Sequence, residues 1–319
     1  MITEFDIIRR YFSRPAPSAV LGVGDDCALL QPRTGMMLAV STDMMIEGRH
    51  FHAGADPAML GHKALAVNLS DLAAMGADPR WGLLSLALPA ADESWLAEFA
   101  RGFYGLASGC GLELIGGDTS RGALTISITV IGEVPTGLAL RRDGALAGDD
   151  VWLSGATGEA ALALAHLEGR ARLEGADRDA CLARLHAPPP RLELGGRLRG
   201  LAHSAIDVSD GLLADLAHIL EASGVGAELR HADLPRPPAI SRCPDAALAM
   251  ACLVAGGDDY ELLFTVAPSR RAEVEALSAD IGLALTRIGT LTHGEPVALL
   301  RDARGNALAP ASRGFDHFK

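Results

Sequence analysis

The stretch Lys63-Ala-Leu-Ala-Val-Asn-Leu-Ser-Asp-Leu-Ala-Ala-Met-Gly-Ala77 (residues 63–77) decides the fold, because it is apolar apart from a few polar positions. It overlaps residues 57–76, which we predict to be a helix, since Pro57 suits a first helical turn and Gly76 suits a helix end. A helix that is apolar on nearly all sides is buried. Asn68 and Asp71 are three residues apart and share one face of this helix. A carboxylate in such a helix is either paired or a ligand.

Outside this helix, further aspartates stand beside glycines, serines or threonines at the edges of apolar runs. They occur in Gly-Asp-Asp (24–26), Ser-Thr-Asp (41–43), Gly-Gly-Asp-Thr (116–119), Asp-Val-Ser-Asp-Gly (207–211), Gly-Gly-Asp-Asp-Tyr-Glu (256–261) and Phe-Asp-His-Phe (315–318). Taken singly, each fits a structural role: Asp210 fits a helix N-cap, and Asp149 and Asp150 beside Gly148 fit a turn. Clustered carboxylates repel one another, and hard cations relieve that repulsion. Magnesium accepts Asp, Ser and Thr oxygens and usually brings phosphates with it, so the set predicts an enzyme that handles a nucleotide through several magnesium ions.

Composition supports a metal-dependent approach to an anionic substrate. The 319 residues favour two domains, and the net charge of −12 argues against nucleic acid as a partner. Only Lys63 and Lys319 are lysines, and no Gly-Lys-Ser/Thr tripeptide of a phosphate-binding loop occurs. Gly22 and Gly24 form a Gly-x-Gly, but Cys27 stands where a dinucleotide fold needs a third glycine.

The cysteines and the apolar runs indicate a cytoplasmic protein. The five cysteines are odd in number, widely spaced and without a Cys-x-x-Cys, which disfavours a disulfide framework or a zinc site. His50 and His52 form a His-x-His without further zinc ligands at a recognisable spacing. The N-terminus is charged early, unlike a signal peptide, and no apolar run reaches the roughly 18–20 residues of a membrane span. We therefore expect no membrane partner.

Predicted strands and helices alternate along both halves of the chain. The first half gives helices at 2–12, 57–76 and 92–110 and strands at 36–42, 82–88, 112–115 and 124–134. The strand at 36–42 is expected to deliver Asp43 at its end, and the strand at 112–115 to end in Gly-Gly-Asp. Prolines and glycines mark 135–149 as a junction. The second half gives strands at 151–154, 205–210, 262–266 and within 285–300, and helices at 157–168, 191–201, 211–223 and 269–281. This pattern predicts two α/β domains.

These motifs together resemble the thiamine-monophosphate kinase family. The matching stretches are 22–30, 41–43, 50–51, 63–77, 115–119, 205–212, 256–262 and 314–318. The Gly-Asp-Asp and Ser-Asp-Gly elements alone would indicate only the wider superfamily of aminoimidazole ribonucleotide synthetase. The long helix motif and the C-terminal Phe-Asp-His-Phe are more specific to the kinases.

The resemblance implies a fold and an activity. It implies an α/β (α+β) protomer with an ATP- and Mg²⁺-binding dimerisation domain at 1–137 and an α/β domain at 138–319. The N-terminal domains are expected to pair in a homodimer and form a shared β-barrel. The implied reaction is ATP-dependent phosphorylation of thiamine monophosphate to thiamine diphosphate, in thiamine diphosphate biosynthesis. The acceptor is itself a phosphate and mostly dianionic at neutral pH, so no separate catalytic base is expected.

The resemblance also implies roles for individual residues. Magnesium ions would be held by Asp26, Ser41, Thr42, Asp43, Asp71, Asp118, Asp207 and Asp210. The nucleotide would contact Gly117, Asp118, Arg142 and Ser209, and thiamine phosphate would contact His50, Asp258 and Phe315. Asp258 departs from the family pattern, which usually has Glu there. Phe315 suits stacking on an aromatic ring, and equally suits a core position that ties down the tail.

Two other classes of function stay open from the sequence. The first is another ATP-dependent enzyme of the same superfamily, acting on a formylglycinamidine, a selenide or a carbamoylated protein thiol. The last two use cysteine chemistry, whereas Cys27 lies in an apolar Cys-Ala-Leu-Leu run and fits a structural role. The second is a magnesium- or nucleotide-binding regulatory protein that keeps the fold without turnover.

Overall fold

The computed structural model describes residues 2–309 and 314, and it divides the chain into two compact α/β units. The first unit comprises Met1–Leu72 and Ala77–Gly137, and the second comprises Ala73–Gly76 and Leu138–Lys319. The last residues of one helix, α2 (Pro57–Ala74), therefore belong to the second unit. Each unit is described by itself below.

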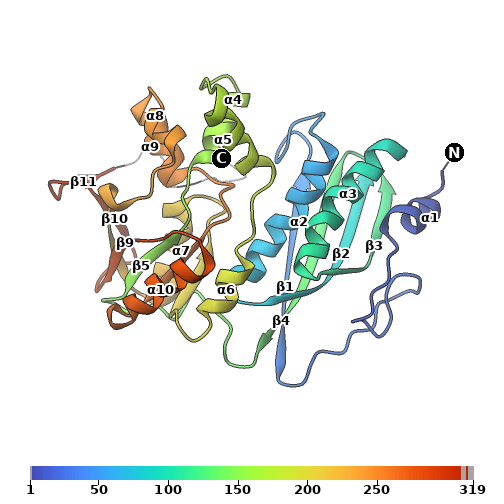
Figure 1. Cartoon of the computed structure of the whole chain (residues 1–319), viewed down its shortest axis with the longest axis horizontal. Helices are drawn as coiled ribbons and strands as arrows, with labels where there is room; N and C mark the ends of the chain where they lie inside the picture. The colour runs from blue at the N-terminus through green and yellow to red at the C-terminus, as the bar shows by residue number, and fades with distance from the viewer. Residues whose placement is uncertain (1, 310–313, 315–319) are drawn as a thin grey trace. The chain divides into compact units, whose positions relative to one another are not determined.

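The first unit is a four-stranded sheet with two long helices on one face (Figure 1). The strand order is β1 (Met36–Ile46), β4 (Thr125–Pro135), β2 (Asp78–Leu88) and β3 (Glu113–Arg121). Strands β2 and β3 are parallel, and the other neighbours are antiparallel. The helices are α2 and α3 (Glu93–Cys110). This is an open sheet, and the described part of the chain forms no closed barrel.

The two long helices of the first unit approach closely because glycines stand where they meet. A Cβ atom on Gly102 would lie 1.8 Å from the carbonyl oxygen of Ala58, and one on Gly61 would lie 2.2 Å from that of Phe99. The apolar helix predicted at 57–76 is confirmed as α2, and its apolar residues are buried from Ala64 to Ala74. Helix α3 begins at the N-cap Asp92, whose side chain accepts two backbone N–H bonds.

The predicted ends of two strands are wrong in a way that matters for the site. Strand β1 does not stop before Asp43, because residues 43–46 continue the pairing with β4 down to Thr125. Strand β3 likewise runs through Gly116 and Asp118 to Arg121, paired with β2. The aspartates therefore lie inside extended strands, where successive side chains point to opposite faces of the sheet.

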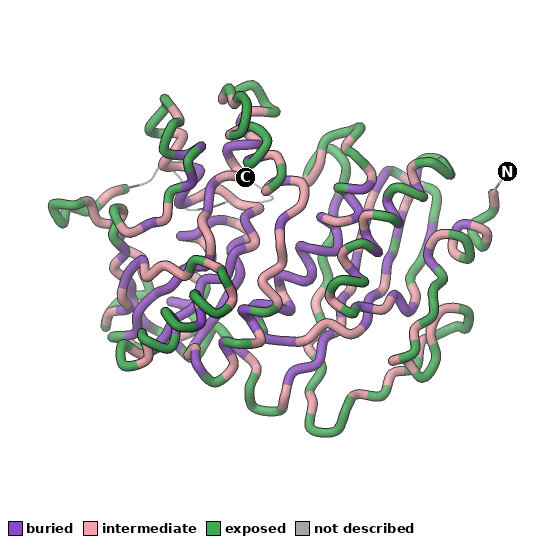
Figure 2. Tube along the Cα trace, in the orientation of Figure 1, coloured by how far each residue is buried: buried purple, intermediate pink, exposed green. Residues whose placement is uncertain are grey.

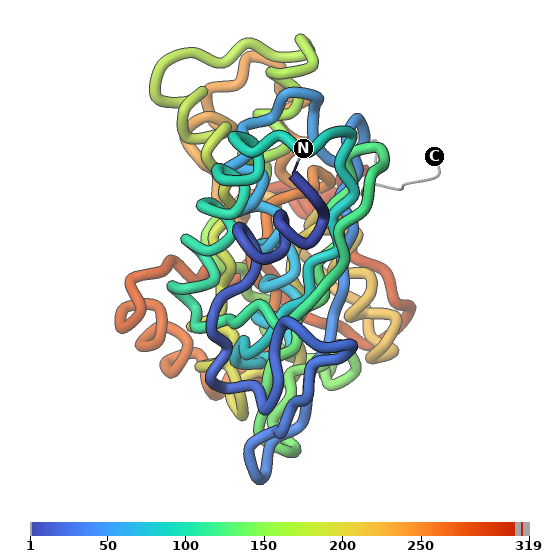
Figure 3. Tube along the Cα trace, turned by 90° about the vertical axis from the view of Figure 1, so that its right-hand side faces the viewer, coloured from blue at the N-terminus to red at the C-terminus, as the bar shows by residue number. Residues whose placement is uncertain are grey.

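The segment before β1 contributes only short helical turns and isolated bridges. Helix α1 (Glu4–Ile7) continues into the π-helical turn η1 (Ile8–Phe12), and the ring of Phe12 meets that of Phe99 edge-on at 6.4 Å. Figure 3 shows this N-terminal segment in dark blue along the outside of the first unit. The Gly-Asp-Asp stretch at 24–26 lies in its irregular part.

The second unit is built on a mixed seven-stranded sheet. The strand order is β11 (Ala307–Leu308), β10 (Ala298–Arg301), β7 (Gly226–Arg230), β9 (Leu285–Thr292), β5 (Asp150–Ser154), β8 (Leu262–Val266) and β6 (Ser204–Asp207). Its helices are α4 (Glu159–Leu167), α5 (Gly175–His186), α6 (Leu192–Leu198), α7 (Leu212–Ser223), α8 (Pro238–Arg242), α9 (Ala246–Ala255) and α10 (Arg271–Ile281). Short 3₁₀ turns are η2 (His231–Asp233) and η3 (Pro268–Arg270).

Strands β5, β8 and β6, at one end of the strand order, are buried on both faces. Every residue of β5, β6 and β8 is buried, and Figure 2 shows buried segments in purple in both strands and helices. One apolar cluster joins the sheet to α7, and another joins it to α6 and α10. No helix among the described residues is long and apolar enough to cross a membrane. The prediction of a two-domain α/β chain is confirmed.

Candidate functional site

Helix α2 and strand β1 bring three of the expected magnesium ligands to the helix-covered face of the first sheet. The hydroxyl of Ser41 donates a short hydrogen bond to Oδ2 of Asp71. Asp43, two residues along β1, points to the same side of the strand. Its backbone N–H donates to Oδ1 of Asn68 at 2.9 Å, and Asn68 in turn donates to the carbonyl of Ala64. Asn68 thus fixes β1 against α2, a role that sequence reasoning did not assign.

Thr42 lies between these residues but presents its side chain to the opposite face. Its hydroxyl donates to the carbonyl of Ile128 at 3.1 Å and accepts from the hydroxyl of Thr129 at 3.0 Å. The alternation of a strand makes this unavoidable once Ser41 faces the helix. The structure therefore separates the Thr42 hydroxyl from the Ser41–Asp71 pair.

Strand β3 holds Gly117 and Asp118 at an exposed position. Gly117 has a φ of +147°, and a Cβ atom there would lie 1.8 Å from the carbonyl oxygen of Leu84, so only glycine fits. Asp118 is exposed, pairs in register with Ser85 of β2, and accepts a bond from the hydroxyl of Ser120 at 3.2 Å. Backbone and carboxylate are both accessible there.

Two other expected residues of the first unit lie in loops. Asp26 is exposed, and its N–H donates to Oδ1 of Asp25 at 2.9 Å. His50 follows β1, and its Nδ1 accepts a bond from the backbone N–H of Ile46 at 3.0 Å. Because Nδ1 accepts, the neutral ring carries its proton on Nε2 and can donate from there.

In the second unit, a buried carboxylate fixes the Ser-Asp-Gly turn after β6. Oδ2 of Asp215 accepts three successive backbone N–H groups, those of Ser209 and Asp210 at 3.0 Å and that of Gly211 at 3.1 Å. Burial raises the pKa of Asp215 to about 7, with the charge of Asp210 adding to the effect and the three N–H donors opposing it. The amides of this turn are thus already occupied by the chain's own carboxylate.

The expectation that Asp210 caps helix α7 is wrong. The N-cap is Gly211, which makes no side-chain cap, and Gly211 has a φ of +126°. A Cβ atom on Gly211 would lie within 2.9 Å of the backbone of Ala255, so the position requires glycine. Asp207, at the end of β6, is buried, and Asp210 is half-buried. Asp215 was missed, although an acidic residue in the first turn of a helix is a signal for bonding to the N–H groups there.

The loop 256–261 lies directly beside this turn. Three backbone bonds of 2.8 Å join them: Asp258 N–H to the Ser209 carbonyl, Tyr260 N–H to the Val208 carbonyl, and Val208 N–H to the Glu261 carbonyl. Strands β6 and β8 are antiparallel, so the end of one and the start of the other share a sheet edge. The second unit therefore gathers the expected metal, nucleotide and substrate residues of these two loops at one edge.

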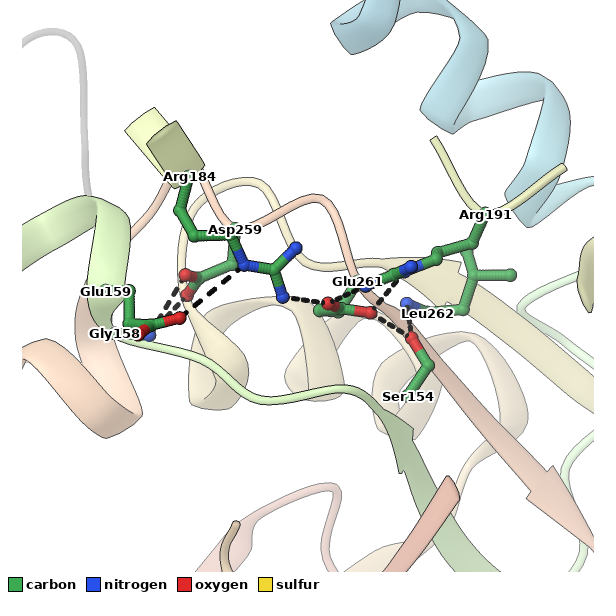
Figure 4. A network of polar contacts seen from close by, with 8 residues as sticks. All are labelled: Ser154, Gly158, Glu159, Arg184, Arg191, Asp259, Glu261 and Leu262. Carbon is green, nitrogen blue, oxygen red and sulfur yellow. Dashed lines mark hydrogen bonds and ion pairs between the residues drawn. The ribbon is translucent and has the colours of Figure 1, made fainter. Parts of the chain in front are cut away.

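Two buried acids anchor this loop (Figure 4). The carboxylate of Glu261 accepts from Nη2 of Arg184 at 2.6 Å, from Nε of Arg191 at 2.7 Å and from the hydroxyl of Ser154. Asp259 accepts the backbone N–H of Gly158 with both oxygens at 2.9 Å. Burial raises the pKa of Asp259 well above its ordinary value, against the effect of this N–H.

The two remaining expected site residues are Arg142 and Phe315. Arg142 is exposed in the segment after the first unit, and its carbonyl accepts a bond from the hydroxyl of Ser223 at 2.7 Å. Phe315 lies outside the described residues. The sequence pattern predicts Asp149 and Asp150 to be turn residues. Asp150 is instead a buried residue of β5, and its carboxylate accepts hydrogen bonds from Arg271 and Arg287.

The oxygen donors of these residues fit a hard cation better than a soft one. Carboxylate and hydroxyl oxygens are the ligands that magnesium accepts. Among the described residues, no group of three or more His, Cys, Asp or Glu side chains that could hold a metal ion is found.

The fold and these loops define the class of protein to which the chain belongs. Residues 24–134 match the family of AIR synthase related proteins, N-terminal domain, and residues 147–301 match its C-terminal domain. The thiamine-monophosphate kinase of Escherichia coli K12 is 44% identical over 320 residues, covering 99% of this chain and 98% of that protein. The chain therefore belongs to the thiamine-monophosphate kinase family.

Solved structures agree with this membership. A crystal structure of thiamine-monophosphate kinase from Stenotrophomonas maltophilia K279a has 45% identity and a TM-score of 0.85, covering 95% of both chains. A structure described as AaThiL complexed with AMPPCP and TMP has 29% identity and a TM-score of 0.78, covering 90% of this chain and 89% of that one.

Proposed function

We propose that the protein transfers a phosphoryl group from ATP to thiamine monophosphate, giving thiamine diphosphate in thiamine diphosphate biosynthesis. The observation that carries this conclusion is the match to a thiamine-monophosphate kinase over 99% of this chain and 98% of the relative. The related complex with AMPPCP and TMP supports the same pair of substrates. The protein is a kinase, and ATP is its co-substrate.

We assign the metal role to the oxygen donors of both units. The proposed magnesium ligands are Asp26, Ser41, Thr42, Asp43, Asp71, Asp118, Asp207 and Asp210. The oxygen-only donor set and the Ser41–Asp71 pair on α2 support this assignment. Because the Thr42 hydroxyl is on the other face of β1, its proposed contribution is the least supported by geometry. When bound, Mg²⁺ supplies charge neutralisation for the phosphates of the two substrates.

We assign the nucleotide and substrate contacts to the residues that the family resemblance implies. Gly117, Asp118, Arg142 and Ser209 are proposed to contact the nucleotide, and His50, Asp258 and Phe315 the thiamine phosphate. Since Asp215 occupies the N–H groups of residues 209–211, Ser209 would act through its hydroxyl rather than its backbone amide. His50, with its proton on Nε2, would donate a hydrogen bond to a phosphate oxygen.

Phosphoryl transfer to a phosphate requires that the substrates be positioned, and it does not require a catalytic base. The acceptor phosphate has a second pKa near 6 and is mostly dianionic at neutral pH, so it attacks without losing a proton to the protein. The protein's own contribution is to orient the acceptor against the transferred group and to keep water from competing for it. A hydrogen-bonded loop pair such as 208–211 and 256–261 suits this task, because its geometry is fixed before the substrate binds.

We further propose that the first unit forms a homodimer. Strand β1 exposes apolar side chains on the face opposite α2, with Val40 62% and Met44 54% exposed and Leu38 and Ile46 alongside them. Strand β1 is also an edge of the sheet. Exposed apolar edges favour association, and pairing with a second copy would close the shared barrel expected from the family. The cytoplasmic location stays a prediction from the sequence.

A product assay tests the activity. Purified protein is incubated with ATP, Mg²⁺ and thiamine monophosphate, and thiamine diphosphate is followed by chromatography, with EDTA and free thiamine as controls. The proposal expects product that depends on Mg²⁺ and on the monophosphate. Turnover of a formylglycinamidine or another substrate, with none of thiamine monophosphate, would identify a sister enzyme. ATP binding without any turnover would identify a regulatory protein.

A further inference from the structure

The loop 256–261 contains an unusual backbone. Asp258 has a φ of +69° and Tyr260 a φ of +52°, and they are the only non-glycine residues with positive φ in the part of the chain that the structure describes. A left-handed conformation is strained for a residue with a Cβ atom. Such conformations persist where the surroundings over-determine them, and they cluster at ligand-binding sites.

The surroundings of this loop do over-determine it. Asp259 and Glu261 alternate with the two left-handed residues, and both are buried. Glu261 is held from three separate segments by Ser154, Arg184 and Arg191, and Asp259 is held by the N–H of Gly158 (Figure 4). Gly155 leaves room for the Glu261 carboxylate, since a Cβ atom there would lie 2.2 Å from Oε1. The alternation locks residues 259 and 261 and thereby fixes 258 and 260.

The hydroxyl of Tyr260 bonds to the Asp258 carboxylate and restricts its direction. The hydroxyl of Tyr260 donates to Oδ1 of Asp258 at 2.9 Å, and the backbone N–H of Asp258 donates to the carbonyl of Ser209 at 2.8 Å. Both side chains are half-buried. A hydrogen bond to an ionised acceptor is stronger than one between neutral groups, so the phenol holds the carboxylate in one rotation.

The charge of Asp258 indicates which part of the substrate it addresses. A carboxylate repels the phosphate of thiamine monophosphate. It attracts the positively charged thiazolium ring and accepts a hydrogen bond from the pyrimidine amine. The aspartate side chain is shorter than glutamate by one methylene, so its reach depends more on how it is aimed.

We propose that Tyr260 is a positioning residue that acts through Asp258: it aims this carboxylate at the cationic thiamine part of the substrate. This inference rests on the proposed function, because it takes Asp258 as a contact of thiamine phosphate. Tyr260 sets the affinity for the acceptor and leaves the binding of ATP unaffected. The anchors at Asp259 and Glu261 hold the backbone in which this bond forms.

The test is Tyr260→Phe, which removes the hydroxyl and keeps the ring. The expected result is a KM for thiamine monophosphate raised about tenfold, the size of losing one hydrogen bond to a charged group, with the KM for ATP unchanged. Calorimetric binding of thiamine monophosphate should weaken by the same factor. The matched control is Tyr11→Phe, which removes a phenol that donates to Glu93 at 3.2 Å on the first unit. The control should leave both constants unchanged.

A double-mutant cycle separates aiming from a merely structural role. In an Asp258→Ala background, Tyr260→Phe should have no further effect on thiamine monophosphate binding, because the group it aims is gone. An effect of full size in that background overturns the proposal, as does a rise in the KM for ATP equal to that for thiamine monophosphate. The proposal is also overturned if the wild-type enzyme is active and the Tyr260→Phe variant has the same KM for thiamine monophosphate as the wild type. A wild-type protein that neither binds nor phosphorylates thiamine monophosphate overturns the proposed function itself and this inference with it.

Discussion

The hydroxyl of Ser41 donates a hydrogen bond to the carboxylate of Asp71, and this bond joins strand β1 to the only acidic residue of helix α2. The helix is mostly apolar and buried, so a carboxylate there is costly unless it is paired or binds a metal. Carboxylate and hydroxyl oxygens are the donors that magnesium accepts, which is the reason for proposing Asp71 and Ser41 as ligands.

We expect Asp71→Asn to lower phosphoryl transfer by about 100-fold or more, since it removes the charge that would hold the metal against the phosphates. The fold should survive, because an amide oxygen can still accept the Ser41 hydrogen bond. Steady-state assays over a magnesium titration, together with circular dichroism, measure both effects. Glu98→Gln serves as the control, because Glu98 is an exposed residue of α3 paired with Arg101. An Asp71→Asn enzyme with normal magnesium-dependent activity would remove Asp71 from the metal ligands.

The sequence predicted helix α2 well because the signals for it are local. Pro57 at the start, Gly76 beyond the end and a largely apolar surface are all readable within the stretch itself. The polar pair Asn68 and Asp71 on one face also emerged as expected, and both contact β1. Spacing along a helix fixes such a pair without knowledge of the rest of the fold.

The strand ends and the side-chain directions could not be predicted in the same way. Whether Asp43 ends a strand or lies inside one depends on its pairing with β4, more than eighty residues away along the chain. The same register decides that Thr42 points away from Ser41. A local pattern indicates that a strand exists, but cross-strand pairing sets where it stops.

The anchors of the loop 256–261 were missed for a similar reason. Glu261 meets Arg184 and Arg191 across 77 and 70 residues, and no local pattern marks any of the three. Helices α5 and α9 were also missed, since α5 carries many charged residues and α9 is apolar throughout, without the alternation of faces that marks a helix in a sequence. These contacts follow from tertiary packing, which overrides local propensity.

We expect Asp258→Glu to keep or lower the KM for thiamine monophosphate, because it restores the side chain usual in the family. The left-handed backbone at position 258 is equally strained for both residues, so the fold should tolerate the change. Kinetics with varied thiamine monophosphate at saturating ATP give the answer. Asp179→Glu, at an exposed position of α5, is the matched control. A KM raised by tenfold or more would argue against a direct substrate contact at Asp258.

We expect Asp150 to make the stability of the protein sensitive to acid. Burial alone would raise the pKa of Asp150, but hydrogen bonds from Arg271 and Arg287 outweigh it and hold the pKa below the ordinary value of 3.8. A depressed pKa gives stability that is fully present above that value and is lost as the pH falls through the lowered pKa. Asp150→Asn should therefore show a shallower fall in Tm between about pH 4 and pH 2 than the wild type.

Thermal unfolding at steps of pH tests this expectation. Asp280→Asn is the control, because Asp280 pairs with Arg197 at the exposed surface, where ion pairs contribute little. Its acid profile should follow the wild type. An Asp150→Asn profile parallel to the wild type at every pH would show that Asp150 is not responsible for the acid loss.

We expect Val40→Glu to convert a homodimer into monomers. Val40 is 62% exposed on the face of β1 opposite α2, and a charge placed in a dry sheet interface is costly to bury. Size-exclusion chromatography with light scattering measures the mass, and circular dichroism checks that each chain stays folded. The control is Leu146→Glu, a similarly exposed apolar residue (57%) on the second unit. A dimeric wild type that stays dimeric with Val40→Glu would place the interface elsewhere, and a monomeric wild type would contradict the dimer itself.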